Sequence, residues 1–194
     1  MTAPIYLALV IHNHQPVGQF DFVNEHAVHT AYEPLLDLLE RHPSVACAIH
    51  FTGSLLDYLI AQQRPLLERV RALVARGQLE VLSGGYYEPL LATLPDADKI
   101  GQIAKLNRTV EDLFGMRPRG MWLAERVWEP HLVRPIAQAG IDYVIIDDTH
   151  FEAVGFDRER ELFGYFVSEE QGDTVRVFPT LSYLRYAIPR DSVP

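Results

Sequence analysis

Apolar residues follow two alternating patterns along this chain. Short continuous runs are typical of strands that are buried on both faces of a sheet, whereas apolar residues three and four positions apart indicate amphipathic helices. The runs predict strands at residues 5–11, 45–51, 79–83, 120–123 and 143–146. The helical spacing predicts helices from near 26 to 40 and at 54–61, 65–76, 96–114 and 130–139. Strand and helix therefore alternate over most of the chain.

The last part of the chain has a different pattern. Residues 162–167 and 174–178 are predicted to form a pair of strands joined by a turn at 171–173. The four or five strand–helix units before them predict an α/β fold with a parallel sheet, either a closed barrel or an open doubly wound sheet. A chain of 194 residues is long enough to form one such domain.

Polar residues follow each of the five predicted strands. In both candidate architectures, ligands bind at the carboxyl ends of the strands. We therefore expect these polar residues to share one rim and to form an active site there. In chain order the strands end in the polar segments 12–16, His50, 84–89, 125–126 and 147–150.

The segment 122–130 has the most informative composition. It contains both tryptophans of the chain, Trp122 and Trp128, on either side of Glu125 and Arg126. Flat apolar rings stack on sugar rings, and a carboxylate between them can attack or stabilise an anomeric carbon. Glu125 is therefore the candidate catalytic carboxylate, the alternative being an ion pair with Arg126. Glu129 precedes a predicted helix start, where a carboxylate favours the helix dipole.

His12 and His14 alternate along an extended segment, so both rings are expected on the same side. They could bind a metal ion together with Asp147, Asp148 or His150. They could equally donate hydrogen bonds to sugar hydroxyls. The residue types alone leave both interpretations open.

Four further carboxylates lie in or soon after predicted strands. Glu88 follows two tyrosines and either contacts a sugar or fixes its loop. Glu80 lies inside a predicted strand, where a buried charge needs a partner. Asp147 and Asp148 end a strand, so one of them is either a second catalytic carboxylate or a turn or capping residue.

The overall charge narrows the class of partner. The net charge is −9, and no run of Lys or Arg occurs, which argues against nucleic acid or an anionic membrane as partner. Cys47 is the one cysteine, so no internal disulfide forms. No segment resembles a secretory signal or a membrane span, and we expect a cytoplasmic location.

Three strings of residues resemble conserved blocks of glycoside hydrolase family 57, in the order and at about the spacing of that family. They are residues 12–16, 77–81 and 122–127. The longer strings 84–89, 147–151 and 184–189 are similar to its 4-α-glucanotransferase and α-amylase-like branch. The resemblance extends from residue 5 to residue 189.

The resemblance implies an incomplete (β/α)7-type barrel, with parallel strands and outer helices, truncated at its C-terminal side. Residues 1–194 would be the N-terminal segment of a single catalytic domain. The implied activity is that of a retaining glycoside hydrolase or 4-α-glucanotransferase acting on α-1,4-glucans or maltooligosaccharides by double displacement. It requires no cofactor and no metal ion.

The family roles transfer to named residues of this chain. The nucleophile falls on Glu125, and substrate-binding positions fall on His12, His14, Glu80 and Trp122. Glu88 lies near the same predicted rim, and we add it to the substrate-binding candidates.

One departure from the family pattern limits these expectations. The resemblance implies that the general acid/base is an aspartate in a fourth block, which lies beyond residue 194. Asp147 and Asp148 belong to a different family position and do not take that role. The expectation is that this chain alone is inactive. The alternatives are a metal-dependent polysaccharide deacetylase or α-mannosidase-like hydrolase, and a non-catalytic glucan-binding remnant.

Overall fold

A computed structural model describes residues 6–185. These residues form two compact units, which are described separately. Unit 1 contains residues up to Glu88 together with Gln102–Pro118, and unit 2 contains Pro89–Gly101 together with residues from Arg119 onward. The boundary at residues 101 and 102 falls within one long helix, α5 (Asp96–Phe114).

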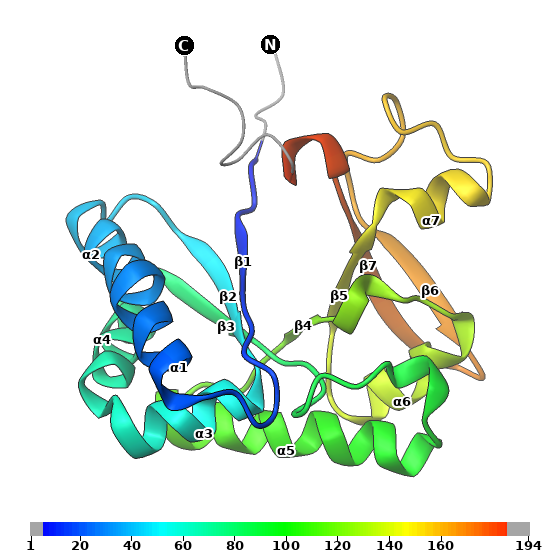
Figure 1. Cartoon of the computed structure of the whole chain (residues 1–194). Helices are drawn as coiled ribbons and strands as arrows, with labels where there is room; N and C mark the ends of the chain where they lie inside the picture. Colours follow the sequence, from blue (N-terminus) through cyan, green and yellow to red (C-terminus); the bar gives the residue numbers. More distant parts are fainter. Residues whose placement is uncertain (1–5, 186–194) are drawn as a thin grey trace. The chain divides into compact units, whose positions relative to one another are not determined.

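Unit 1 is a three-stranded parallel sheet with helices on one face (Figure 1). The strands are β1 (Val10–Asn13), β2 (Cys47–Phe51) and β3 (Leu79–Leu82), in that spatial order. The helices are α1 (Asp21–Ala27), a π-helical turn at Val28–Tyr32, α2 (Glu33–Arg41), α3 (Gly53–Gln62), α4 (Arg64–Ala75) and the second part of α5.

The strand register separates the two faces of this sheet. Ile49, Phe51 and Val81 join the apolar side chains of the helices in one buried core. Because side chains alternate along a strand, His50 and Glu80 lie on the opposite face. The helices therefore bury the apolar face and leave the polar face for other functions.

The predicted first strand, 5–11, was wrong in its position. Residue 5 lies outside the described part, Tyr6 and Leu7 are exposed, and β1 begins only at Val10. The pairing with β2 explains the shift, because Val10 is opposite Ala48 and the Ala48 N–H bonds to the Leu9 carbonyl. β1 is also an edge strand of its sheet, so it is not buried on both sides.

The first predicted helix began too late. Helix α1 starts at Asp21, and the π-helical turn separates it from α2. A π turn inserts an extra residue and shifts the helical periodicity. The leucine spacing of α2 therefore cannot be extended back through that turn.

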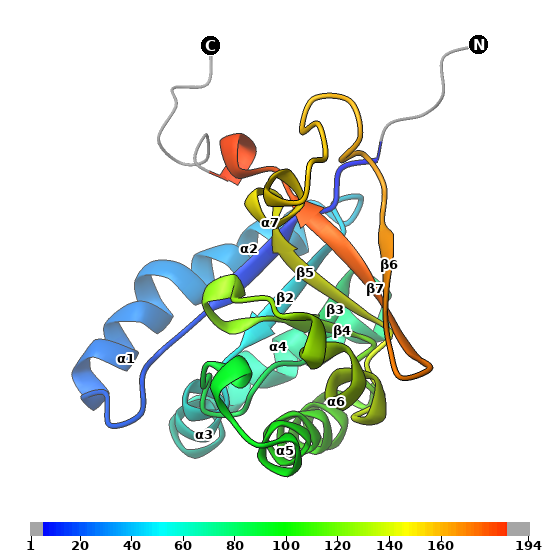
Figure 2. The same ribbon diagram turned by 90° about the vertical axis from the view of Figure 1, so that its right-hand side faces the viewer.

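Unit 2 contains a four-stranded sheet, which Figure 2 shows most openly. Its strands are β4 (Gly120–Trp122), β5 (Tyr143–Asp147), β6 (Phe166–Glu170) and β7 (Asp173–Thr180). The order is β4-β5-β7-β6, with β4, β5 and β7 parallel and β6 antiparallel to β7. The predicted α/β class with parallel strands is thus confirmed in both units.

Helices and short helical turns complete unit 2. They are the turn Leu91–Thr93, the first part of α5, the turns Ala124–Arg126 and Pro130–Leu132, α6 (Val133–Gln138) and α7 (Asp148–Ala153).

One prediction in this region was wrong, and one helix was missed. The strand expected at 162–167 is found at Phe166–Glu170, because its pairing with β7 runs to Glu170 opposite Asp173, at the turn itself. Helix α7 was not predicted, because residues 147–150 were interpreted only as the polar end of a strand.

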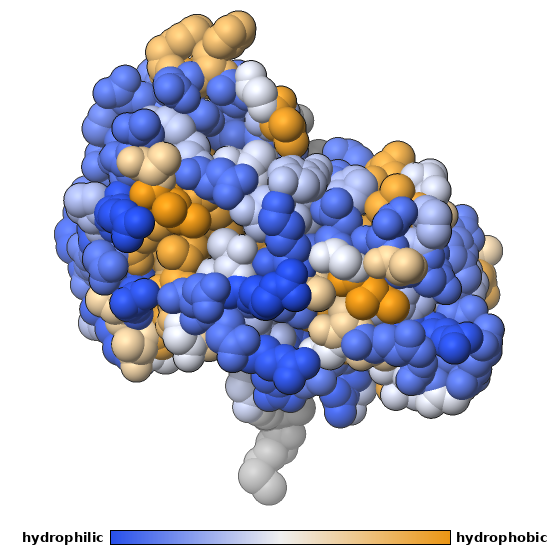
Figure 3. All heavy atoms as spheres, turned by 90° about the horizontal axis from the view of Figure 1, so that it is seen from below, coloured by the Kyte–Doolittle hydropathy of each residue, from blue (hydrophilic) through white to orange (hydrophobic). Residues whose placement is uncertain are grey.

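The surface in Figure 3 is mainly hydrophilic, with several separate apolar areas. Among the helices of residues 6–185, none combines the length and the apolar character needed to cross a bilayer.

Two glycines provide a matched test of packing in this fold. A Cβ at Gly53 would lie 2.3 Å from the buried Tyr86 ring, whereas a Cβ at Gly101 would meet nothing within 4 Å. We expect Gly53→Ala to lower the free energy of unfolding by about 2 kcal/mol through overpacking. We expect Gly101→Ala, inside α5, to raise it by about 0.5–1 kcal/mol. Urea unfolding measures both, and equal stability of the two variants would contradict this account of the Gly53 contact.

Candidate active site

Three histidines gather at the polar face of unit 1. His12 on β1 is opposite His50 on β2, and their ring centroids are 5.0 Å apart. The Nδ1 atoms of these two rings are 2.9 Å apart, so one ring donates a hydrogen bond to the other. The His14 ring also stacks on His12, at 5.8 Å between centroids. The prediction that His12 and His14 lie on one side is confirmed.

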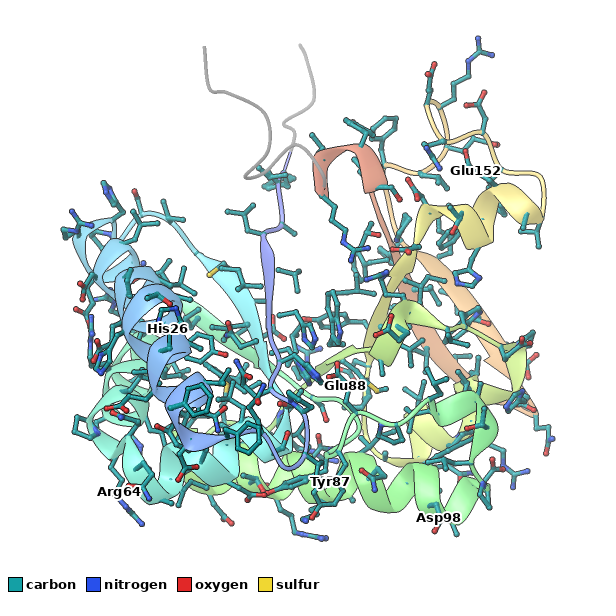
Figure 4. The ribbon with its side chains drawn as sticks, viewed as in Figure 1. His26, Arg64, Tyr87, Glu88, Asp98 and Glu152 are labelled. Carbon is teal, nitrogen blue, oxygen red and sulfur yellow. The ribbon has the colours of Figure 1, made fainter. Side chains whose placement is uncertain are left out.

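Glu88 ties this cluster together. Its Oε1 is 3.1 Å from His12 Nε2, and its Oε2 pairs with His14 Nδ1. Figure 4 shows Glu88 beside the end of β1. Glu88 has φ of 53°, a left-handed conformation that residues other than glycine rarely adopt. Strain of this kind, of order 1–3 kcal/mol, is concentrated at functional sites.

His50 is the buried member of the cluster. It is 0% exposed, and its Nε2 has no hydrogen-bond partner among the described residues. Burial, followed by the nearby His12 and His14, lowers the pKa of His50 well below its ordinary value. His50 is therefore a neutral ring at neutral pH, and its contact with His12 orients that side chain.

Glu80 lies on the same face of the sheet. It is half-buried on β3, opposite Ala48, and one pleat before Leu82, the residue opposite His50. The structure therefore places Glu80 near the histidine row along the strand direction, at about 7 Å per pleat.

The candidate nucleophile stands at the end of β4 in unit 2. Glu125 and Arg126 have φ of 49° and 53°, so two consecutive residues are left-handed. Trp122, the last residue of β4, is half-buried, and Glu125 is exposed. Among residues 6–185, none forms an ion pair or side-chain hydrogen bond with the Glu125 carboxylate.

Two residues from the end of β5 and from α7 hold this strained turn. Asp147 Oδ1 is 2.8 Å from Arg126 Nε and also accepts a hydrogen bond from Thr180 Oγ1 at 3.0 Å. His150 Nε2 lies 2.9 Å from the Arg126 carbonyl oxygen. Arg126 thus pairs with Asp147 and not with Glu125, and the Glu125 carboxylate stays open to solvent.

Asp148 has a different environment. It is 0% exposed, accepts a hydrogen bond from the Ser182 N–H at 3.0 Å and from its hydroxyl, and lies 3.0 Å from Arg158 Nε. These contacts make Asp148 a structural anchor at the start of α7.

The structure gives His12 and His14 a different third metal-ligand candidate from those weighed in the sequence. In the part of the chain that the structure describes, the grouping suited to an ion is His12, His14 and Glu88, whose ligand atoms lie within 4.8 Å of one another. Asp147, Asp148 and His150 are engaged with Arg126, Ser182 and the Arg126 carbonyl. The sequence reasoning missed Glu88 as a ligand because it lies far along the chain from His12.

Comparison with known proteins decides the family. Residues 8–191 match glycosyl hydrolase family 57. The chain belongs to that family. It is 52% identical over 189 residues to an α-amylase 1 from Dictyoglomus thermophilum and 45% identical over 179 residues to a 4-α-glucanotransferase from Thermococcus kodakarensis. These alignments cover 97% and 92% of this chain but only 27% of each relative.

A solved structure agrees with the sequence comparison. The 4-α-glucanotransferase of Thermococcus litoralis matches 97% of this chain with a TM-score of 0.93 and 41% identity, over 29% of that chain. Branching enzymes of the family share the fold at TM-scores of 0.74 and 0.75. The predicted fold class, part of a (β/α)7-type barrel, and the predicted family are confirmed.

The pKa of His50 gives a test of the histidine cluster. Because the folded pKa is lowered, the unfolded state takes up a proton below about pH 6.5 and the folded state does not. We expect stability to fall as pH drops from 6.5 toward 5, by up to about 1.4 kcal/mol per pH unit from this group. We expect the His50→Gln variant to lack this contribution to the loss of stability at low pH. Urea unfolding at several pH values would measure the difference.

His29 is the matched control. Its pKa is raised, mainly by a hydrogen bond with Glu33, so its contribution has the opposite sign and is present at low pH. His29→Gln is expected to retain the acid-side loss in full. A His50→Gln variant with the same pH dependence as the unchanged protein would contradict the neutral, buried state of His50.

Proposed function

We propose that this protein acts on α-1,4-glucans as a retaining glycoside hydrolase or 4-α-glucanotransferase, and that residues 1–194 are the N-terminal segment of its single catalytic barrel. The observation that carries the proposal is the exposed Glu125 carboxylate, on a left-handed turn three residues after Trp122, which pairs with no side chain of residues 6–185. The relatives named α-amylase and 4-α-glucanotransferase support the substrate class.

Glu125 takes the role of nucleophile. Its carboxylate attacks the anomeric carbon, the glycosidic bond breaks, and the leaving oxygen takes a proton from a general acid. Water or a sugar hydroxyl then attacks the same carbon, gives its proton to the same acid group, now acting as a base, and releases Glu125. Hydrolysis and transfer share the glycosyl-enzyme and differ only in this acceptor.

The general acid is neither Asp147 nor Asp148. Asp147 is paired with Arg126 and Thr180, and Asp148 is buried against Ser182 and Arg158. An acid/base residue must reach the glycosidic oxygen, and these two carboxylates are occupied in holding the turn and α7.

The substrate-binding residues divide by what their polar atoms already contact. Both nitrogens of His12 are engaged, by His50 and Glu88, so His12 holds the Glu88 carboxylate in place. His14 uses Nδ1 for Glu88 and is exposed, which leaves its Nε2 for a sugar hydroxyl. Glu80 and Glu88 accept hydrogen bonds from hydroxyls, and Trp122 supplies an apolar ring for a sugar face.

The charge and cysteine content support two further proposals. A net charge of −9 and a single cysteine fit a cytoplasmic protein without a nucleic-acid partner.

A metal-dependent hydrolase is the second candidate function. His12, His14 and Glu88 supply three ligands, as catalytic zinc sites do, and would leave a fourth position for water. The chain is also 24% identical over 157 residues to a human α-mannosidase 2. Stoichiometric zinc binding that His14→Ala abolishes would favour this function. Glu125 has no task in that scheme.

Covalent trapping tests the nucleophile. A fluorinated α-glucosyl fluoride carries a leaving group that needs no proton, so attack by Glu125 breaks the carbon–fluorine bond at C1 without a general acid. We expect peptide mass spectrometry to find one sugar esterified to Glu125.

Two variants make the test specific. Glu125→Gln is expected to abolish the label, and Glu129→Gln, an exposed carboxylate four positions later, to retain it. A label on another carboxylate, or none, would contradict the role of Glu125. Oligosaccharide binding without any label would favour the non-catalytic, glucan-binding alternative.

A further inference from the structure

Glu88 is carried by a short loop that follows β3. The loop contains a tight turn, which a hydrogen bond from the Glu88 N–H to the Gly85 carbonyl closes at 2.9 Å. Glu88 itself is left-handed, and such a conformation persists only where its surroundings hold it. The contacts of the two residues before it, Tyr86 and Tyr87, therefore help to decide where the Glu88 carboxylate lies.

Helix α3 holds Tyr86. The side chain is 3% exposed, and its hydroxyl donates a hydrogen bond to Asp57 Oδ1 at 2.6 Å. The Tyr86 carbonyl accepts a hydrogen bond from the Gly53 N–H at 2.8 Å. Burial, followed by the hydrogen bond with Asp57, raises the pKa of Tyr86 above its ordinary value, so the phenol stays protonated and remains a donor. Both the backbone and the side chain of Tyr86 are thus fixed.

Helix α5 holds Tyr87 in the same two ways. The Tyr87 N–H donates a hydrogen bond to Gln102 Oε1 at 3.0 Å, and the Tyr87 hydroxyl oxygen accepts one from Lys105 Nζ at 2.6 Å. Gln102 and Lys105 are three positions apart, so they are neighbours on one side of the helix. Figure 4 shows Tyr87 next to α5 and Glu88 beside the end of β1.

The Lys105 ammonium contacts both tyrosine rings. Its Nζ is 3.7 Å from the centroid of the Tyr86 ring and 4.3 Å from that of the Tyr87 ring. The two rings meet edge to face, with their centroids 4.9 Å apart. An ammonium within about 6 Å of a ring centroid is attracted to the face of the ring. One cation therefore links the tyrosine that α3 holds to the tyrosine that α5 holds.

The partners of this ammonium all belong to the loop before Glu88. Lys105 is half-buried, and among residues 6–185 its ammonium contacts the two rings and the Tyr87 hydroxyl but no carboxylate. Removing a charge from water is unfavourable unless the charge gains partners. The place of Lys105 is therefore explained by the order it gives to Tyr86 and Tyr87.

We propose that Lys105 is a positioning residue for the Glu88 carboxylate and acts through Tyr87. Tyr87 and Glu88 are consecutive, with Cα atoms about 3.8 Å apart, so a displacement of Tyr87 moves the backbone that carries Glu88. Lys105 keeps the carboxylate where His12 and His14 contact it and where a sugar hydroxyl can donate a hydrogen bond to it. The sugar-binding part rests on the proposed function.

The imidazole nitrogen signals of the histidines, read by NMR spectroscopy, test this role. Lys105→Met removes the ammonium and keeps an unbranched side chain that suits a helix. We expect the signals of His12 and His14 to shift, because Glu88 contacts both rings. The ring of His29, which pairs with Glu33, is the internal reference and should not respond. A merely structural role would lower the melting temperature and leave the signals of His12 and His14 in place.

Three further variants make the test specific. Lys105→Arg keeps a cation that donates hydrogen bonds and stacks on aromatic rings, so it should restore the original signals. Arg108→Met removes an exposed cation three positions further along α5 and is the matched control. Tyr87→Phe removes the hydroxyl at an exposed side chain, so it tests the same link even if Lys105→Met does not fold. If Lys105 acts through Tyr87, adding Tyr87→Phe to Lys105→Met causes no further shift.

Calorimetric titration with maltotetraose tests the consequence for the sugar site. Lys105→Met is expected to weaken binding about tenfold, the loss expected when one hydrogen bond to a sugar hydroxyl is misplaced. Lys105→Arg and Arg108→Met should retain the original affinity. Unchanged signals of His12 and His14 in a folded Lys105→Met variant would overturn the positioning role. Shifted signals with unchanged affinity would overturn its use in sugar binding.

The outcome is separable from that of the proposed function. If Glu125 takes the covalent label but the histidine signals do not respond to Lys105→Met, the positioning role fails and the nucleophile assignment stands. If the signals respond while Glu125 is unlabelled, the positioning role stands and the catalytic role fails.

Discussion

The Glu125 carboxylate is presented by a backbone conformation that side chains other than glycine rarely adopt. Two left-handed residues in succession, Glu125 and Arg126, cost of order 1–3 kcal/mol each, and such a turn persists only where its surroundings hold it. Asp147 holds the Arg126 side chain, and His150 contacts the Arg126 carbonyl. Because Asp147 takes up the guanidinium, the Glu125 carboxylate has no ion-pair partner among residues 6–185. The roles of β5 and α7 in the site follow from this one constraint.

Unit 1 also contains a left-handed acidic residue that neighbouring side chains hold in place. Glu88 is also left-handed, and its carboxylate is held between His12 and His14. His50, buried and neutral, fixes the ring of His12 from the sheet. Each unit thus combines a strained acidic residue in a loop with supporting side chains from neighbouring parallel strands. This arrangement places polar chemistry at strand ends, while the other face of the sheet in unit 1 remains an apolar core.

Local signals in the sequence predicted the elements that local residues determine. Helix α5 matches its prediction at both ends, because Pro95 and Gly115 flank a clear helical period. The start of β1 depends on its register with β2, and the amino-acid sequence of residues 5–13 does not show where that pairing begins. Left-handed backbone at Glu88 and Glu125 carries no sequence signal, since neither is glycine. The Arg126–Asp147 ion pair joins residues that follow two different strands, so the sequence could not predict it either. The sequence predicted the carboxylate and identified the family, while the structure shows which side chains hold the turn that carries Glu125.

Chemical rescue measures the central claim, that Glu125 is the nucleophile. Glycine suits the left-handed backbone at this position, so Glu125→Gly should fold while losing the carboxylate. With α-glucosyl fluoride and added azide, azide takes the vacated place and attacks C1 opposite the departing fluoride. The anomeric configuration of the product, read by NMR spectroscopy, is the decisive measurement. The account predicts β-glucosyl azide from Glu125→Gly and not from the unchanged protein. An α-configured azide, or no azide product above the uncatalysed rate, would contradict it.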